Sequence, residues 1–79
     1  MAKRIVPKEK VLNRLKIILA QKSKTNLWLA EQMGKNIATV SEWCTNTKQP
    51  KLENLYKIAR ILDVEVRKLI VPTKEKEEE

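Results

Sequence analysis

The side chains that most often carry catalysis or bind metals are almost absent from this sequence. The 79 residues contain no histidine and a single cysteine, Cys44, so the commonest general base is missing and no internal disulfide bond can form. Without a histidine to activate it, we expect Cys44 to be a small buried hydrophobic residue. The single glycine excludes a glycine-rich phosphate loop, and no carboxylate pair falls in a plausible pocket. We therefore expect no enzyme activity, no metal and no cofactor.

The charge distribution gives the first indication of function. The formal net charge is +7, from 17 Lys and Arg against 10 Asp and Glu. The excess lies in residues 1–24, which hold eight basic residues and one acidic residue, whereas residues 25–50 sum to zero. A basic surface attracts polyanions such as nucleic acid or an acidic membrane. Charge alone leaves open the alternative that the lysines only keep a helical surface soluble.

Length and hydropathy place these charges on one small domain. A chain of 79 residues has the length of a single domain, and 42% apolar with 34% charged residues is typical of a globular helical protein. The longest apolar run, residues 17–20, is too short for a membrane span or a signal-peptide core, so we expect no membrane association and a cytoplasmic location. We expect a flexible basic arm over 1–8, a folded domain over 9–72 and a frayed charged tail over 73–79.

Apolar residues at steps of three and four predict an all-α fold. The predicted helices cover residues 9–22, 26–33, 37–44 and 52–63, with a short fifth helix that carries Val66, Leu69 and Ile70. The first helix would present one apolar face formed by Val11, Leu12, Leu15, Ile18 and Leu19. No segment has the alternating pattern of a β-strand.

The second and third predicted helices form a compact pair. Thr25 and Asn36 can each cap a helix N-terminus, and Gly34 can end the second helix in the left-handed conformation that glycine adopts at little cost. Two short helices that cross steeply around a tight turn also need a small residue at their contact and apolar residues to hold the second helix. Ala30 meets the first need, and Val40 and Trp43 meet the second.

Here the sequence resembles the Cro/repressor-type helix-turn-helix family, also called the XRE family. The matching segments are 29–34 (LAEQMG), 38–43 (ATVSEW), the loop to Pro50, 52–59 (LENLYKIA), Asp63-Val64 and Leu69-Ile70. They follow the family's order over roughly residues 11–71. The resemblance implies a compact five-helix, lambda-repressor-like DNA-binding domain that acts in transcriptional regulation.

In that family the second helix of the motif enters the major groove, and its N-terminal residues meet base edges. The resemblance thus implies a recognition helix at about 37–44, with base-contact candidates Asn36, Ile37, Ala38, Thr39, Ser41 and Glu42. An amide can read adenine, a hydroxyl can bond several edges, an apolar group can touch the thymine methyl, and a carboxylate can accept from cytosine N4. Other roles stay open, since Asn36 can cap the helix, Ile37 can shield the turn, and Glu42 can be solvated.

Contacts to DNA phosphates are implied at both ends of the motif, where they would position the protein without reading sequence. The candidates are Asn26, Lys35, Thr45, Asn46, Thr47, Lys48 and Lys51. The recognition helix contains no Arg or Lys, the residues that most often read guanine, so we expect modest or A·T-biased direct readout. Lys3 and Arg4 of the arm would add affinity and, in the minor groove, would read its width.

Besides the lack of Arg and Lys in the recognition helix, the sequence departs from the family pattern at two further places. The family often pairs an Arg late in its first helix with a Glu at the end of the recognition helix, where this chain has Leu19 and Cys44. Replacing a buried ion pair by apolar residues is often neutral or stabilising, so the fold prediction stands. The position after Gly34 is usually apolar but is Lys35 here, whose stem can cover the turn.

We interpret the chain as a sequence-specific double-stranded DNA-binding regulator, and as a repressor that binds a two-fold operator as a homodimer. Leu69, Ile70 and Val71 either form the dimer surface or close the core. The alternative is an antitoxin or adaptor of the same fold whose main partner is a protein, such as a toxin. Salt dependence separates the two, because a DNA binder loses affinity linearly in log salt, whereas a protein-docking module binds little DNA at any salt.

Overall fold

The computed structural model describes residues 11–73. All helices and strands that it assigns within these residues are helices. In chain order the elements are α1 (Leu15–Gln21), α2 (Asn26–Met33), α3 (Ile37–Cys44), α4 (Leu52–Leu62) and the 3-10 helix η2 (Val66–Leu69). This confirms the predicted all-α class, with the fifth helix reduced to a 3-10 turn. The predicted arm over 1–8 and most of the predicted tail over 73–79 lie outside the described residues.

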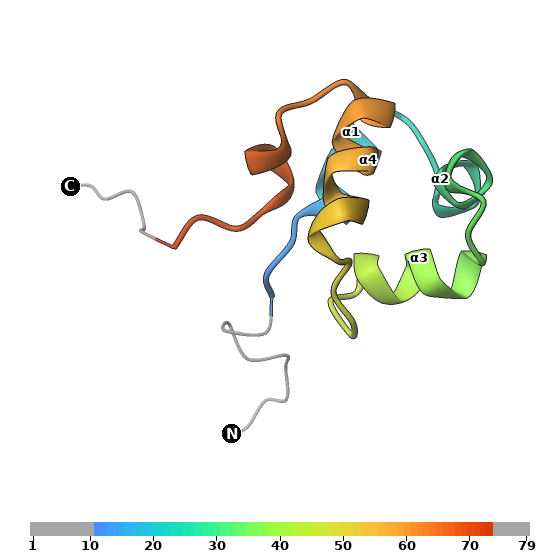
Figure 1. Cartoon of the computed structure of the whole chain (residues 1–79), viewed down its shortest axis with the longest axis horizontal. Helices are drawn as coiled ribbons and strands as arrows, with labels where there is room; N and C mark the ends of the chain where they lie inside the picture. Colours follow the sequence, from blue (N-terminus) through green and yellow to red (C-terminus); the bar gives the residue numbers. More distant parts are fainter. Residues whose placement is uncertain (1–10, 74–79) are drawn as a thin grey trace.

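One hydrophobic core joins all of these elements. Its buried residues are Leu15, Ile18, Leu19, Leu29, Ala30, Val40, Trp43, Cys44, Ile58, Ala59, Leu62 and Leu69. Trp43 is 5% exposed and Cys44 is 6% exposed, which confirms that both are core residues, as their spacing predicts. In Figure 1, α2 and α3 lie at one end of the molecule, α4 stands in the middle, and η2 lies at the other end. No helix in residues 11–73 is long and apolar enough to cross a bilayer.

Local capping interactions set the ends of α2 and α3. Thr25 Oγ1 accepts a hydrogen bond from the Trp28 N–H at 3.0 Å, and Asn36 Oδ1 accepts one from the Ala38 N–H at 2.7 Å. Gly34 ends α2 with φ of 65°, in the left-handed region. The caps at Thr25, Gly34 and Asn36 are therefore confirmed. They fix where each helix begins and ends, and so they set the turn between α2 and α3.

The predicted helix over 9–22 is wrong over residues 11–14, and residues 9 and 10 lie outside the described residues. Residues 11–14 are not helical, and Val11 and Leu12 are 37% and 49% exposed rather than part of the core. Their backbone instead pairs with the chain after η2, because the Arg14 N–H donates to Leu69 O at 2.8 Å and the Val71 N–H donates to Leu12 O at 2.9 Å. Asn13 and Ile70 form an isolated antiparallel bridge. The apolar spacing continues through this stretch, but tertiary hydrogen bonds hold it extended.

A cluster of three side-chain amides forms hydrogen bonds around the non-helical residues before α1. We call Asn13, Asn46 and Gln49 the amide cluster. Asn13 is 5% exposed; its Nδ2 donates to Trp43 O at 2.9 Å and to Gln49 Oε1 at 2.7 Å, while its Oδ1 accepts from the Leu15 N–H. That last bond satisfies a donor in the first turn of α1, so α1 begins at Leu15. The cluster thereby ties the start of α1 to the end of α3.

The burial of Leu69 decides, for this residue, between the two predictions made for the apolar residues at the end of the domain. Leu69 is fully buried and closes the core, so it cannot form the dimer surface that was one of the two expectations. Ile70 remains 40% exposed and Val71 is half-buried. The reason is the short η2 turn, which directs Leu69 inward while the following residues pair along residues 12–14.

Gly34 offers a direct test of the turn between α2 and α3. A Cβ placed on Gly34 would meet no atom within 4 Å, so the cost of a side chain comes from its left-handed backbone alone. Gly34→Val should lower the free energy of unfolding by roughly 1 kcal/mol or more, because branched residues disfavour positive φ. Thermal and urea unfolding measure this change.

Gly34→Asn is the matched control for that substitution. Asparagine tolerates the left-handed region, as Asn46 does here with φ of 63°. We expect it to cost clearly less than valine. Equal losses for the two variants, or a melting temperature that valine leaves unchanged, would contradict the assigned turn.

Candidate nucleic-acid interface

The two faces of α3 have opposite environments. Val40 is completely buried and Trp43 nearly so, whereas Ile37 is 45% exposed and its neighbour Ala38 is exposed. In Figure 1, α3 runs along the lower edge of the molecule with its N-terminal end away from α4. The first turn of α3 is thus a free surface.

Hydrogen bonds between α2 and α3 fix the orientation of that surface. The Asn26 side chain at the start of α2 donates from Nδ2 to Ser41 Oγ and accepts at Oδ1 from Cys44 Sγ, each at 3.3 Å. Burial raises the pKa of the Cys44 thiol, against a smaller opposing effect of the Lys16 charge, so the thiol keeps the proton that it donates. Asn26 therefore links two successive turns of α3 to α2.

The start of α3 presents polar and charged side chains to solvent. Asn36 caps the helix with its Oδ1 and is itself exposed, as is Lys35. The Lys35 N–H returns to Ala30 O at 2.9 Å, which holds the turn closed. A helix N-terminus carries partial positive charge and free N–H groups, both of which favour an anion. The turn therefore presents an exposed amide, an ammonium group and a helix dipole together.

The loop after α3 continues the same exposed surface. Thr45 Oγ1 lies within hydrogen-bond distance of Ser41 O and Glu42 O at 3.2 Å and of Thr47 Oγ1 at 2.8 Å. Thr47 and Lys48 direct their backbone N–H groups to Glu42 O, so the loop wraps back over the end of α3. Their side chains remain exposed. We call the exposed residues of this region the α3 surface: Lys35, Asn36, Ile37, Ala38, Thr45, Thr47 and Lys48.

The candidate contact residues thus fall into two groups. Lys51 is exposed together with the α3 surface, whereas the half-buried candidates are Asn26, Thr39, Ser41, Glu42 and Asn46. Asn26, Ser41 and Asn46 use their side chains for contacts within the fold. Base or phosphate contacts by any of these residues stay predictions, but the fold places all of them on α2, α3, the turn between these two helices or the loop between α3 and α4.

Sequence reasoning missed the amide cluster: Asn13 and Gln49 were not among its candidates, and Asn46 was predicted only as a phosphate contact. Asn13 sits inside an apolar pattern that predicts a helix, and no local signal marks its burial. Asn46 carried a weak signal, since asparagine is one of the residues that adopt positive φ, and it does so here at 63°. Trp28 packs partly against the core, and Lys24 Nζ lies 4.6 Å from its ring centroid.

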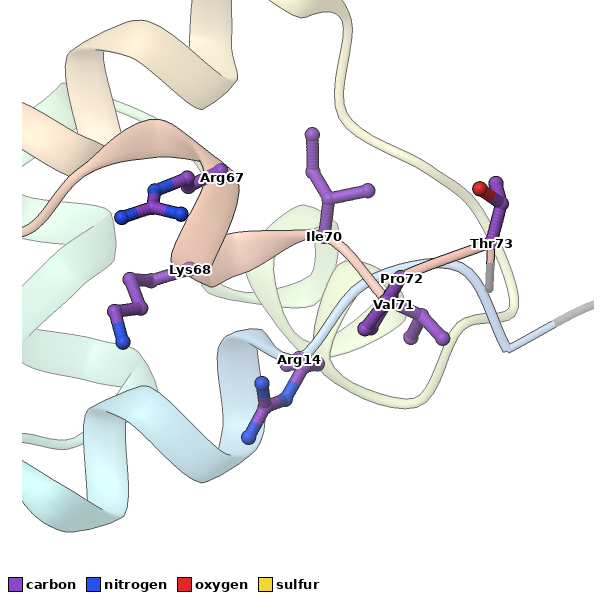
Figure 2. A pocket seen from close by; sticks show the side chains of 7 residues that line it. All are labelled: Arg14, Arg67, Lys68, Ile70, Val71, Pro72 and Thr73. Atoms are coloured by element: carbon purple, nitrogen blue, oxygen red, sulfur yellow. The ribbon is translucent and has the colours of Figure 1, made fainter. Parts of the chain in front are cut away.

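A shallow groove lies on another part of the surface. Figure 2 shows its lining, with the basic side chains of Arg14, Arg67 and Lys68 beside the apolar residues Ile70, Val71 and Pro72, and Thr73 at one end. The groove follows the pairing between residues 12–14 and 69–71. None of the candidate contact residues lines it, so it is separate from the α3 surface.

Comparisons with known proteins agree with this geometry. Among solved structures, the chain is similar to the "Crystal structure of a putative DNA-binding protein from Bacteroides fragilis", with 55% sequence identity and a TM-score of 0.75; the match covers 76% of this chain and 97% of that chain. No curated protein sequence matches significantly. A family model described as helix-turn-helix matches residues 15–69, which span α1 to η2 and well over half of the chain. The chain therefore belongs to the helix-turn-helix family.

Proposed function

We propose that this protein is a sequence-specific double-stranded DNA-binding transcriptional regulator whose α3 enters the major groove. The observation that carries the proposal is the first turn of α3, which is capped, exposed and apolar at Ile37 while the opposite face is fully buried. A major groove about 12 Å wide admits one α-helix presented in this way. The similarity to a solved protein described as putatively DNA-binding supports the same reading.

Base readout would come from short polar and apolar side chains. Ile37 and Ala38 are exposed and would contact a thymine methyl, and the exposed Asn36 caps the helix with its Oδ1. The only charged residue of α3 is Glu42, which is half-buried. Because α3 offers no Arg or Lys for guanine, we expect a recognition sequence with an A·T bias at the directly read positions.

Phosphate contacts would come from the edges of the motif. Lys35, Lys48 and Lys51 are exposed at the two ends of α3 and before α4. Thr45 and Thr47 add hydroxyl groups beside Lys48. Contacts of this kind hold the helix in register on the duplex while the bases supply selectivity.

One such domain makes a small interface with DNA. A single module buries about 600–1,000 Å² of protein surface, so two copies on half-sites about 34 Å apart give a regulator useful affinity. We propose that the protein binds a two-fold operator as a homodimer and acts as a repressor by occupying it.

Selection of bound duplexes from a random pool, at low and at physiological salt, tests the proposal. The expected winners share a two-fold motif bound by two protein copies. Failure to enrich any duplex at low salt would sink the DNA-binding function and would favour an adaptor or antitoxin whose main partner is a protein.

Ala38→Glu should abolish binding to the selected duplex. The carboxylate would lie among bases and phosphates, which repel it, yet it would sit at the positive N-terminal end of α3, where acidic residues stabilise a helix. The melting temperature should therefore stay the same or rise slightly. Fluorescence anisotropy and thermal unfolding report the two effects separately.

Ala20→Glu is the matched control, since Ala20 is an exposed alanine near the end of α1. It adds the same charge outside the α3 surface, and we expect it to bind DNA nearly as the wild-type protein does. Wild-type affinity in the Ala38→Glu variant would contradict the placement of α3 in the groove.

Lys48→Gln should change the salt dependence of binding. If Lys48 contacts one phosphate, the slope of log affinity against log salt should become shallower by about 0.9, with similar weakening for all duplexes. Lys57→Gln, at an exposed lysine of α4 outside the candidate set, should leave the slope unchanged. Identical slopes for the two variants would remove Lys48 from the interface.

A further inference from the structure

We propose that the shallow groove beside η2 is a docking site for an acidic, extended segment of a partner protein, a segment that also carries an apolar side chain. We call this groove, which is lined by Arg14, Arg67, Lys68 and residues 70–73, the basic groove. The inference goes beyond the proposed DNA-binding function and can fail separately from it, because none of the candidate DNA contacts lines the basic groove.

The charge of the basic groove is entirely positive. Among the described residues that line it, three are basic and none is acidic. Within residues 11–73, none of these three basic side chains forms an ion pair with a carboxylate. Glu65 precedes η2 in the chain but does not line the groove. Guanidinium groups bind carboxylates through two parallel hydrogen bonds, so the groove favours a ligand that contains Asp or Glu.

The basic groove has a charged end and an apolar end. In Figure 2 the charged groups of the three basic residues lie at one end, whereas Ile70, Val71 and Pro72 lie toward Thr73. Ile70 is 40% exposed, so part of a large aliphatic side chain is open to a ligand. The volume of about 400 Å³ accommodates only a few side chains. A matching ligand therefore places an apolar residue within a few positions of its carboxylates.

Backbone hydrogen bonds hold the two sides of the basic groove together. The Arg14 N–H donates to Leu69 O at 2.8 Å, and the Val71 N–H donates to Leu12 O at 2.9 Å. Leu69 itself is fully buried and anchors η2 in the core. The backbone of the groove is thus fixed before a ligand arrives, which lowers the entropy cost of binding.

A second copy of this chain is a less favourable occupant of the basic groove. A two-fold contact brings the same residues of both copies together. The basic side chains of one copy would then lie against those of the other, and like charges that meet across an interface repel. An acidic segment of a different protein has the opposite charge and meets no such cost.

A DNA backbone would also attract the basic residues, but it leaves the apolar end without a partner. Contacts to phosphates and sugars are polar, whereas Ile70 and Pro72 need an apolar group. In Figure 1, η2 lies at the end of the molecule opposite α2 and α3. A partner in the basic groove and a duplex on the α3 surface would therefore bind the protein at the same time.

The test begins with a library of random short peptides displayed on phage and selected against the full chain. The enriched peptides should share an Asp or Glu within a few positions of a large apolar residue. A synthetic, fluorescent copy of the most enriched peptide then serves as the probe. Its affinity is measured by fluorescence anisotropy for the wild-type protein and for variants of the groove, with and without the selected duplex.

Arg67→Gln/Lys68→Gln should weaken binding of the probe by about fivefold or more, because two exposed ion pairs are lost. The matched control is Lys57→Gln/Arg60→Gln, which neutralises two exposed basic residues of α4 outside the groove. We expect the control to bind the probe nearly as the wild-type protein does. Both double variants should bind the duplex normally, and the duplex should leave the affinity of the wild-type protein for the probe unchanged.

Ile70→Ser tests the apolar end of the groove. The substitution should weaken binding of the probe by about tenfold, because an apolar contact is lost. Ile17→Ser is the matched control, since Ile17 is a 47% exposed residue of α1 that does not line the groove. It should bind the probe with wild-type affinity. Melting temperatures of the two serine variants report any loss of the fold.

Failure to enrich any peptide, or equal affinity of the probe for the wild-type protein and both groove variants, would overturn the inference. Duplex binding or self-association that is lost in the groove variants would instead assign the groove to DNA or to a second copy. A lower melting temperature of Arg67→Gln/Lys68→Gln, with no peptide enriched, would assign it to the chain's own glutamates after Thr73. A wild-type protein that binds the probe but no duplex would contradict the proposed function alone.

Discussion

Burial of one face of α3 is the constraint on which the rest of this structure depends. Isolated helices of eight residues, the length of α2 and of α3, are not stable in water, so each keeps its form only through tertiary contacts and caps. Val40 and Trp43 provide those contacts for α3, and Asn36 provides the cap. Because the stabilising contacts apart from the Asn36 cap use the inner face, the other exposed positions of α3 can vary in sequence without loss of the fold. A binding surface placed there is free to change its specificity.

A polar network, rather than further apolar packing, completes the domain at the junction of α1 and α3. Asn13 is almost fully buried, and both the nitrogen and the oxygen of its side-chain amide have hydrogen-bond partners, as buried polar groups require. α3 ends at Cys44, and α1 contributes Leu19; both side chains are in the core. Leu19 and Cys44 contribute apolar packing to this part of the core, and the polar link between the start of α1 and the end of α3 is the amide cluster.

The contrast between α2–α3 and the start of α1 shows what the sequence could predict. The bounds of α3 and the caps at Thr25, Gly34 and Asn36 follow from residues close in sequence, and all are confirmed. The first turns of the predicted first helix fail because the backbone groups of residues 12–14 bond to Asn46 and to residues 69–71, which no local pattern reveals. Periodicity also could not decide whether Leu69 faces inward, since a single 3-10 turn sets its direction. The candidate site was found because it coincides with a capped local motif.

The pairing between residues 12–14 and 69–71 brings the two ends of the described domain side by side. Domains whose ends meet can be inserted into another chain, or joined to a second module, with little disturbance of their interior. Here the paired segments lie directly before the start of α1, away from the N-terminal end of α3 in Figure 1. Fusion of this domain to a reporter or to a tandem copy through either end would therefore leave α3 accessible. Because the two ends of the described domain are adjacent, a short linker could also join them in a circular permutation.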